Sequence, residues 1–301
     1  MQSLPLVVSF LVALVVAPGL VRSLREQGFV RENYRGAEVA FPAGIAIVAS
    51  ALLSLIVVAP LDKIAGLDIF RPETRDAFVY VMGVAMLGLL DDLVGSGALR
   101  PPAALRGEPL GGAGQPAPIR PPRGWRGHAA ATLRGGFSTG ALKASGTLAL
   151  ALFVLAGSGL DTGEYLLAVG LLVLATNLFN LLDLRPGRSI KALVLLAAAL
   201  TLGTFDLDPL WALGLFAGPV LVLLPLDLRE TGMLGDTGSN VVGAVAGLWL
   251  VLTLSTTGQA VALALIAVAT LYGEFRSISA LVERTPLLRH LDSLGRPTSH
   301  A

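Results

Sequence analysis

Long apolar stretches separated by short polar segments dominate the pattern of the 301-residue chain. The hydrocarbon core of a bilayer is about 30 Å thick and is crossed by about 20 mostly apolar residues in a helix. Nine stretches approach this length, and they are apolar all round, whereas barrel strands alternate. They cover residues 4–21, 40–60, 77–92, 141–157, 164–182, 190–204, 209–225, 241–255 and 259–273. The pattern predicts an all-α fold, a polytopic transmembrane helical bundle of about nine helices.

Composition supports a membrane protein and excludes several kinds of site. Hydrophobic residues make up 54% of the chain and charged residues only 14%, whereas soluble domains have about a quarter charged. The net charge of +1 gives no indication of a nucleic-acid partner. With no cysteine, disulfides, thiolate metal sites and cysteine nucleophiles are excluded. The three histidines lie far apart, which favours oxygen ligands and a hard cation such as Mg²⁺.

The distribution of basic residues predicts the orientation. Lysine and arginine are retained on the cytoplasmic side of a membrane. If the N-terminus lies outside, all 22 basic residues fall on the inside except Lys63, Arg71 and Arg75. We therefore expect a multi-pass protein of the cell membrane with a cytoplasmic C-terminus.

The same pattern predicts the domain organisation. Residues 1–275 form one transmembrane domain, interrupted by a flexible cytoplasmic loop at about 96–138. Within this loop, residues 96–127 are rich in proline, glycine and arginine and cannot form a packed core. Residues 276–301 form a cytoplasmic amphipathic tail, in which His290 lies on the membrane surface. The oligomeric state stays open, with a homodimer as one alternative.

Acidic residues at helix ends indicate the chemistry, because a carboxylate near hydrocarbon is costly unless it is paired, hydrated or bound to a cation. The third stretch ends in Gly88-Leu89-Leu90-Asp91-Asp92. Two adjacent carboxylates repel each other, so they are expected to hold a proton or attract a cation. A solvated helix end is the alternative.

A second polar motif closes the fifth stretch. Asn177, Asn180 and Asp183 are spaced by three residues and share a helix face about 120° wide. They could face a ligand, or they could form the interhelical amide hydrogen bonds that are common inside membranes.

A third motif, Gly235-Asp236-Thr237-Gly238-Ser239-Asn240, comes immediately before the eighth stretch. Its glycines, hydroxyls and helix N-terminus resemble a phosphate-binding turn with one carboxylate for a metal. The same residues also make an ordinary N-cap and turn. All three motifs fall on the cytoplasmic side of the predicted topology, and together they suit a magnesium-bound diphosphate.

These motifs resemble the signature loops of the polyprenyl-phosphate N-acetylhexosamine-1-phosphate transferases, glycosyltransferase family 4, which include phospho-N-acetylmuramoyl-pentapeptide transferase. The resemblance extends in order from the Asn33-Tyr34-Arg35-Gly36 loop to the last helix. It implies Mg²⁺-dependent transfer of a sugar-1-phosphate, of the N-acetylhexosamine type, from a UDP-sugar to polyprenyl phosphate. UMP would be released at the cytoplasmic membrane face, in peptidoglycan or another cell-wall or surface glycan pathway.

The resemblance also implies roles for individual residues. Asp91 and Asp92 match the aspartate pair that engages lipid phosphate and metal, and Lys143 lies near a lysine used for phosphate. The implied catalytic residues are Asp91, Asp92, Asp183 and Asp236. The implied substrate-binding residues are Asn177, Asn180, Lys143, Gly238 and Ser239. The implied magnesium ligands are Asp92 and Asp236. Positioning and charge neutralisation are the usual means of assisting phosphoryl transfer.

Two departures from the family pattern keep other functions open. Pro186 stands where the family has a second aspartate, and His290 stands alone where the pentapeptide branch has a histidine cluster. We expect Arg185 and Arg188 to anchor their helix at the anionic leaflet, and Asp227 and Glu230 to be hydrated. The alternatives are a degenerate relative that binds lipid phosphate or nucleotide without turnover, and a membrane transporter.

Overall fold

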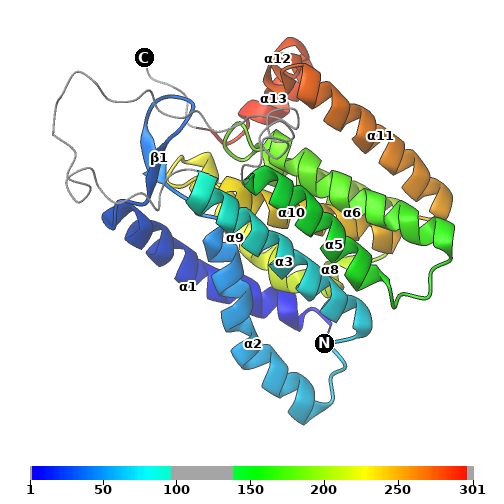
Figure 1. Ribbon diagram of the computed structural model, residues 1–301. Coiled ribbons are helices and arrows are strands. Elements are labelled where there is room, and N and C mark those ends of the chain that lie inside the picture. The colour runs from blue at the N-terminus through cyan, green and yellow to red at the C-terminus, as the bar shows by residue number, and fades with distance from the viewer. Residues whose placement is uncertain (1, 96–137, 297–301) are drawn as a thin grey trace.

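The computed structural model describes residues 2–95 and 138–296, and this part of the chain is almost entirely helical (Figure 1). The twelve helices are α1 (Leu4–Glu26), α2 (Ile45–Ala65), α3 (Pro72–Gly95), α5 (Thr139–Leu155), α6 (Thr162–Leu182), α7 (Arg188–Thr204), α8 (Asp208–Ala212), α9 (Gly214–Leu228), α10 (Gly235–Thr253), α11 (Thr256–Phe275), α12 (Ile278–Arg284) and α13 (Pro286–Ser293). The flexible loop predicted at about 96–138 lies, apart from Ser138, outside the described residues.

Each of the nine apolar stretches overlaps a helix, namely α1, α2, α3, α5, α6, α7, α9, α10 and α11, and the stretch 209–225 is divided between α8 and α9. Five of these, α1, α2, α3, α6 and α11, are long and apolar enough to cross a membrane. The helical prediction is confirmed, and the architecture is that of a helical membrane protein.

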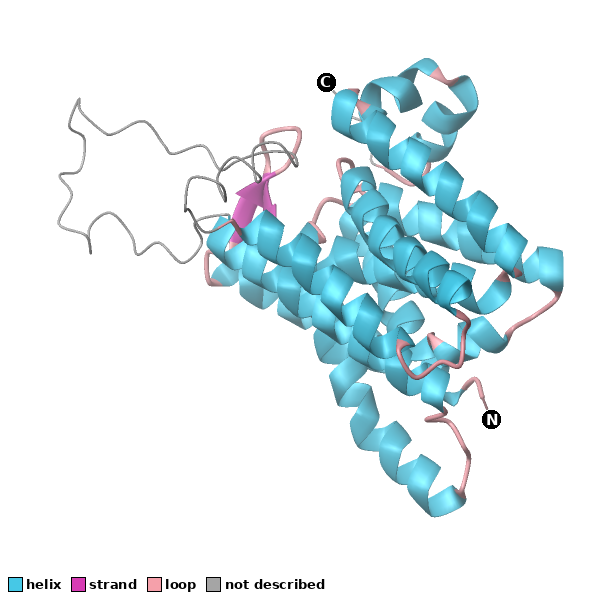
Figure 2. Cartoon of the chain, turned by 45° about the vertical axis from the view of Figure 1, so that its right-hand side comes forward, coloured by secondary structure: helices cyan, strands magenta, loops and turns pink. Residues whose placement is uncertain are grey.

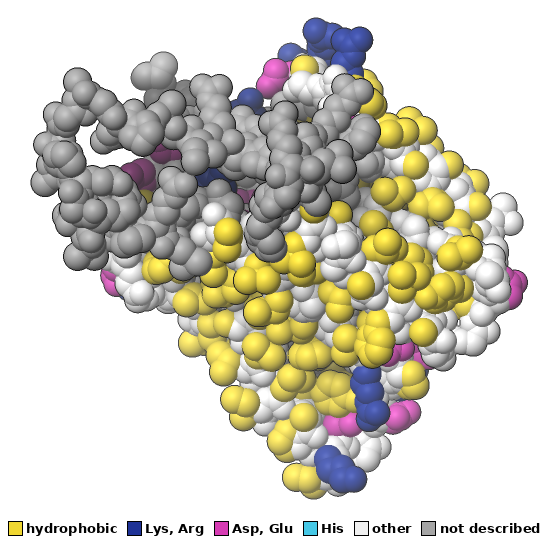
Figure 3. Space-filling view, in the orientation of Figure 1, with side chains coloured by type: hydrophobic (Ala, Val, Ile, Leu, Met, Phe, Trp, Pro, Cys, Tyr) yellow, Lys and Arg dark blue, Asp and Glu magenta, His cyan; other side chains and the backbone are white. Residues whose placement is uncertain are grey.

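The outer surface agrees with this architecture. Figure 3 shows hydrophobic side chains over the middle of one face, with charged side chains toward its two ends. On α2, Ile56 is 69% exposed, and on α11, Leu265 is 67% exposed. Such broad apolar exposure is costly in water but favourable against lipid.

Helix α10 forms the centre of the bundle and packs against α3, α6 and α7 (Figures 1 and 2). Nearly all of its residues from Gly235 to Leu250 are buried. Glycine permits the closest approach: a Cβ on Gly88 of α3 would lie 2.4 Å from the carbonyl oxygen of Asp236. The two motifs that meet at this crossing are therefore held together by backbone packing.

Several boundaries differ from the prediction, and two of these differences bear on the site. Helix α10 begins at Gly235 and not near 241, so the glycine-rich motif is the first turn of the helix and not a loop ahead of it. Helix α3 continues past Asp92 to Gly95. In both places polar residues interrupt the apolar pattern but the helix continues, because groups on neighbouring helices form hydrogen bonds or ion pairs with these residues.

A short hairpin corrects the all-α prediction in detail. Strands β1 (Val30–Glu32) and β2 (Glu38–Ala40) pair antiparallel, with Val30 opposite Ala40 (Figure 2). The side chain of Asn33 closes the turn by accepting hydrogen bonds from the N–H groups of Arg35 and Ala37. Three residues per strand are too few to give a period-two pattern, so the sequence did not indicate this element.

Candidate functional site

Three charged side chains from three helices meet at one end of the bundle. The ammonium of Lys143, on α5, lies 3.2 Å from a carboxylate oxygen of Asp91 on α3 and also pairs with Asp236 on α10. The three side chains are 20 to 30% exposed. Residues far apart in sequence thus form one charged group that a ligand can reach, as the motifs predicted.

Asp92 has a different environment from its neighbour Asp91. It is 4% exposed, and it accepts hydrogen bonds from the N–H groups of Asp236 (2.9 Å) and Thr237 (2.8 Å) and from the Thr237 hydroxyl (2.6 Å). Both carboxylate oxygens are engaged in capping the first turn of α10. These bonds give Asp92 a structural role, and its expected role as a metal ligand stays a prediction.

The other residues of the glycine-rich motif face the protein interior. Ser239 and Asn240 are each 1% exposed, and both accept hydrogen bonds from the side-chain amide of Asn180, at 3.1 and 3.3 Å. Gly238 is packed against the backbone of Gly44, where a Cβ would come within 2.9 Å. The expected substrate contacts of Gly238 and Ser239 are corrected to helix packing, since little of either residue is accessible.

Asp183 lies at the C-terminal end of α6 and is partly buried. Burial raises the pKa of its carboxyl well above the usual value, and the nearby carboxylates of Asp227, Asp236 and Asp92 raise it further. The structure therefore places Asp183 within the same negative field. Asp227 itself is only 5% exposed and accepts a hydrogen bond from Gly187 N at 2.7 Å, so the expectation of a hydrated Asp227 is wrong.

A cavity of about 460 Å³ adjoins the charged group. Asp91, Lys143 and the amides of Asn177, Asn180 and Asn240 give it a polar side, and Val173 and Leu174 give it an apolar wall. It is also lined by Gly140, Ala141, Ala144, Thr147, Thr176, Leu181 and Glu274. Asn177 is exposed, whereas Asn180 is partly buried and donates hydrogen bonds to Ser239 and Asn240. The lining thus combines charged and amide groups with an apolar surface.

The donor set for a metal is limited to what Asp91 and Asp236 offer. Across residues 2–95 and 138–296, no group of three His, Cys, Asp or Glu side chains is placed to hold a metal ion. Mg²⁺ is commonly held by one or two carboxylates together with substrate phosphates and water. The pair Asp91 and Asp236 fits that arrangement, and magnesium binding stays a prediction.

The hairpin adds a polar network that the sequence did not indicate. Glu230 accepts hydrogen bonds from Asn33 Nδ2 (2.6 Å) and the Tyr34 hydroxyl (3.3 Å) and pairs with Arg35 at 3.4 Å. The guanidinium of Arg185 lies 4.2 Å from the centre of the Tyr34 ring. Glu230 is thus bound by the hairpin and not simply hydrated, and the hairpin is tied to the segment that precedes α10.

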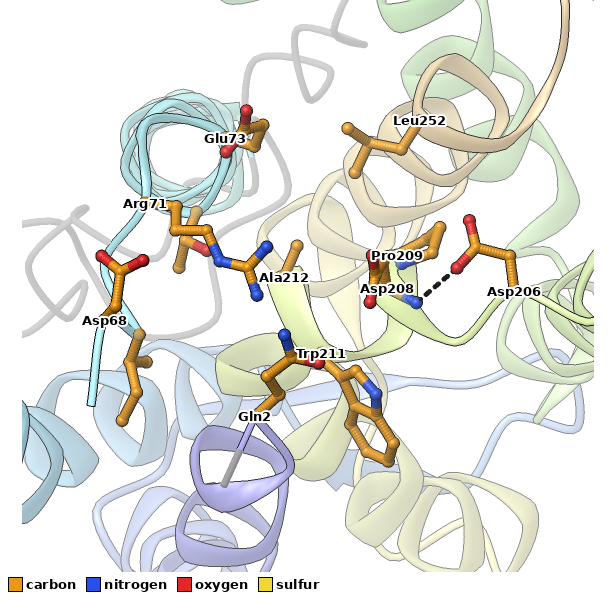
Figure 4. Close-up of a pocket in the computed structure, with 12 residues that line it drawn as sticks. Gln2, Asp68, Arg71, Glu73, Asp206, Asp208, Pro209, Trp211, Ala212 and Leu252 are labelled. Atoms are coloured by element: carbon orange, nitrogen blue, oxygen red, sulfur yellow. Dashed lines mark hydrogen bonds between the residues drawn. The ribbon is translucent and has the colours of Figure 1, made fainter.

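The opposite end of the bundle has a smaller cavity of about 260 Å³. Figure 4 shows the guanidinium of Arg71 pointing into it between Asp208 and Trp211, and Asp206 accepting a hydrogen bond from the N–H of Asp208 at 2.8 Å. Asp208 is exposed at the start of α8. None of the predicted site residues lines this cavity.

Comparisons with known proteins give no assignment. No family model matches the chain, and no curated protein matches it significantly. Function must therefore be inferred from the site.

Proposed function

We propose that the protein transfers a sugar-1-phosphate from a UDP-sugar to polyprenyl phosphate and releases UMP. The observation that carries the proposal is the meeting of Asp91, Lys143 and Asp236, from three separate helices, beside a cavity with one polar and one apolar side. A membrane lipid with a phosphate head would use both sides of the cavity, because its charged head needs the polar side and its chain needs an apolar surface.

Lys143 has the role of binding phosphate. Its ammonium lies between two carboxylates at the polar side of the cavity, where it can donate hydrogen bonds to the phosphate oxygens of a ligand. The phosphate of the acceptor lipid is ionised at neutral pH, so the protein mainly has to place it in line with the diphosphate and to neutralise charge. Asn177, which also lines the cavity, provides an amide donor.

Asp91 and Asp236 would hold Mg²⁺ together with the oxygens of the diphosphate. A bound magnesium ion would supply charge neutralisation on the leaving nucleotide. Asp183 lies close enough to Asp236 and Asp92 for their charges to raise its pKa, so that it can hold a proton beside them, and Asp92 fixes the turn that carries Asp236. Asp92 is therefore proposed as a positioning residue and not as a ligand.

We further propose that all nine apolar helices cross the cell membrane, with the N-terminus outside and the site on the cytoplasmic side. The distribution of lysine and arginine supports this orientation. The chain lacks cysteine, so single cysteines introduced at exposed positions at the two ends, Glu32 and Lys63, can be labelled in intact cells. We expect an impermeant maleimide to label Lys63→Cys only; labelling of Glu32→Cys would invert the topology.

The test of activity is a donor panel. Purified protein with undecaprenyl phosphate, Mg²⁺ and a series of UDP-sugars should release UMP with at least one donor and form a lipid-linked sugar diphosphate. Chelation of the metal should stop the reaction. No UMP from any donor would contradict the proposal.

A relative that binds lipid phosphate without turnover is the second candidate. The observation that favours it is that Lys143 already pairs with both Asp91 and Asp236, so that one of the two negative charges is balanced without a metal. This candidate predicts retention of polyprenyl phosphate, lost in Lys143→Gln, with no UMP release. Turnover with any donor would exclude it.

A further inference from the structure

The C-terminal arm, defined as α12, α13 and residues 294–296, docks on the start of α7. Figures 1 and 2 show α12 and α13 at the same end of the bundle as the candidate site. The sequence predicted an amphipathic tail that lies on the membrane. Contacts between the arm and α7 show that it is also attached to the body of the protein, and its place on the membrane stays a prediction.

Asp292 is the centre of this attachment. Its two oxygens accept hydrogen bonds from Arg188 on α7, at 2.8 and 3.1 Å, and from Arg296, at 2.7 and 3.0 Å. The side chains of the three residues are only 7 to 12% exposed. Both arginines thus bind the carboxylate through two donors each, the strongest geometry available to this pair. Arg188 does not serve as a leaflet anchor, contrary to the expectation.

Lys191 provides a second attachment. Its ammonium donates hydrogen bonds to the main-chain carbonyls of Leu291 (2.9 Å), Asp292 (2.5 Å) and Leu294 (3.2 Å). These carbonyls lie at the end of α13, where intrahelical partners are missing and a cation is favoured. The arm is therefore held at α7 by side chains from two successive turns.

The arm also contacts the turn between α6 and α7, which begins with Asp183. Arg296 Nε donates a hydrogen bond to the carbonyl of Pro186 at 2.9 Å. The next residue, Gly187, has a φ of +71°, and its N–H donates to Asp227. The turn is thus fixed from one side by the arm and from the other by a buried carboxylate of α9.

Because the carboxylate of Asp292 is largely buried, we expect the attachment of the arm to α7 to depend on it. Removing one partner of a buried ion pair leaves an uncompensated charge, which costs far more than losing an exposed pair. The exposed pair Arg185–Glu283, at 26% and 61% exposure, joins the same turn to α12 and serves for comparison. Burial alone would raise the pKa of Asp292, but its hydrogen bonds with Arg188 and Arg296 outweigh burial and lower it. The carboxylate is ionised at neutral pH.

We propose that the C-terminal arm is a positioning element for the candidate site. Asp292, held by Arg188 and Arg296, fixes the turn at residues 183–187 and thereby holds Asp183 among the other carboxylates. Asp292 and Arg296 act through the turn and do not contact substrate. The attachment of the arm to the turn does not depend on catalysis, whereas the effect of the arm on turnover rests on the proposed function.

A distance measurement tests the structural part without any need for activity. Spin labels at Leu184→Cys in the turn and Arg289→Cys on α13 use two exposed positions, and the native chain has no cysteine to interfere. We expect one narrow distance distribution, a clearly broader one with Asp292→Asn, and a narrow one again with Asp292→Glu. Glu283→Gln is the matched control, which removes the exposed charge.

Two results would overturn the inference. One is a distribution that stays narrow in Asp292→Asn, and the other is equal broadening by Glu283→Gln. If Asp292→Asn does not fold, Arg296→Gln takes its place, because it removes the Pro186 contact and leaves the pair of Asp292 with Arg188. A distribution that stays narrow in Arg296→Gln, or equal broadening by Glu283→Gln, would then overturn the inference.

Kinetics test the positioning role if the donor panel gives turnover. We expect Asp292→Asn to lower kcat about 10-fold to 100-fold, as small displacements of reacting groups do. KM for the UDP-sugar should change by less than about threefold, because no substrate contact is lost. Recovery of kcat in Asp292→Glu is expected, and a rise in KM alone would contradict the role. A wild type without turnover would reject the proposed function, while the distance distribution would still decide on the arm.

Discussion

Two charged clusters lie at the same end of this molecule, and they differ in how their charges are balanced. In the site cluster, one cation, Lys143, faces the two carboxylates of Asp91 and Asp236, and the side chains are 20 to 30% exposed. In the arm cluster, two arginines share the carboxylate of Asp292, and the side chains are 7 to 12% exposed. The first holds more carboxylates than cations at a place that a ligand can reach, whereas the second has its carboxylate oxygens fully engaged.

The difference separates charges that hold the fold from charges that can act on a substrate. A buried and saturated pair is costly to break but offers nothing to a ligand. A partly exposed pair with excess negative charge contributes little stability and attracts a cation or the donors of a substrate. Asp92, although adjacent to Asp91, belongs with the saturated group because its oxygens cap α10.

The largest effect is expected from Asp236→Asn. The variant keeps the bulk of the side chain but removes one of two carboxylates available to a metal, so UMP release should fall by at least about 100-fold. Rates at several Mg²⁺ concentrations and a thermal unfolding curve check this. Asp206→Asn, at the opposite end, is the control. If Asp236→Asn kept the magnesium dependence of the wild type, Asp236 would not be a magnesium ligand.

A smaller loss is expected from Lys143→Gln, by about 10-fold to 100-fold in kcat/KM, because a charge-assisted hydrogen bond to phosphate is lost. Lys143→Arg should recover part of the activity, since it restores a cation at the same place. Binding of polyprenyl phosphate measured alongside turnover locates the defect. Full activity in Lys143→Gln would show that the cation only neutralises Asp91 and Asp236.

Asp92→Ala should lower stability, and it should affect turnover only through the turn that carries Asp236. Two backbone N–H groups and the Thr237 hydroxyl would lose their acceptor, at a cost of about 2 to 4 kcal/mol. Thermal unfolding in detergent, compared with Asp91→Ala, measures the effect. We expect the melting temperature to fall for Asp92→Ala and to change little for Asp91→Ala. The reverse order would contradict the distinction drawn between the two aspartates.

The smallest effect concerns the pH dependence of stability at Asp183. Its pKa is raised in the folded protein, so the folded state keeps a proton that the unfolded chain loses above about pH 4. The free energy of unfolding therefore decreases as pH rises from that value through the raised pKa. Asp183→Asn should raise the melting temperature more at about pH 8 than at about pH 5. If the melting temperature rose equally at both pH values, or if Asp206→Asn gave the same rise, the pH dependence could not be assigned to Asp183.

Much of the architecture could be predicted because membrane helices carry their signal locally. Every apolar stretch is largely helical, and the polar motifs at 91, 180 and 236 do meet. The roles within the motifs were less predictable. Asp91 and Asp92 are neighbours in sequence, yet one faces Lys143 and the other faces the end of α10. Successive residues of a helix point about 100° apart, and only the packing of α3 against α10 decides which one is buried.

The partners of Glu230 and Asp292 were beyond prediction for the same reason. Asn33 and Glu230 are 197 residues apart, and Arg188 and Asp292 are 104 apart, and no local pattern links such pairs.

The sequence by itself determined that the chain is helical and apolar enough for a membrane, and which charged residue types it holds at its helix ends. Hydrophobicity and helical period act over a few residues, so they can be read along the chain. Only the tertiary structure decided which of these charges are saturated and which stay open to a ligand. That distinction depends on distances between helices, which close packing at glycines such as Gly88 and ion pairs such as Arg188–Asp292 set in three dimensions.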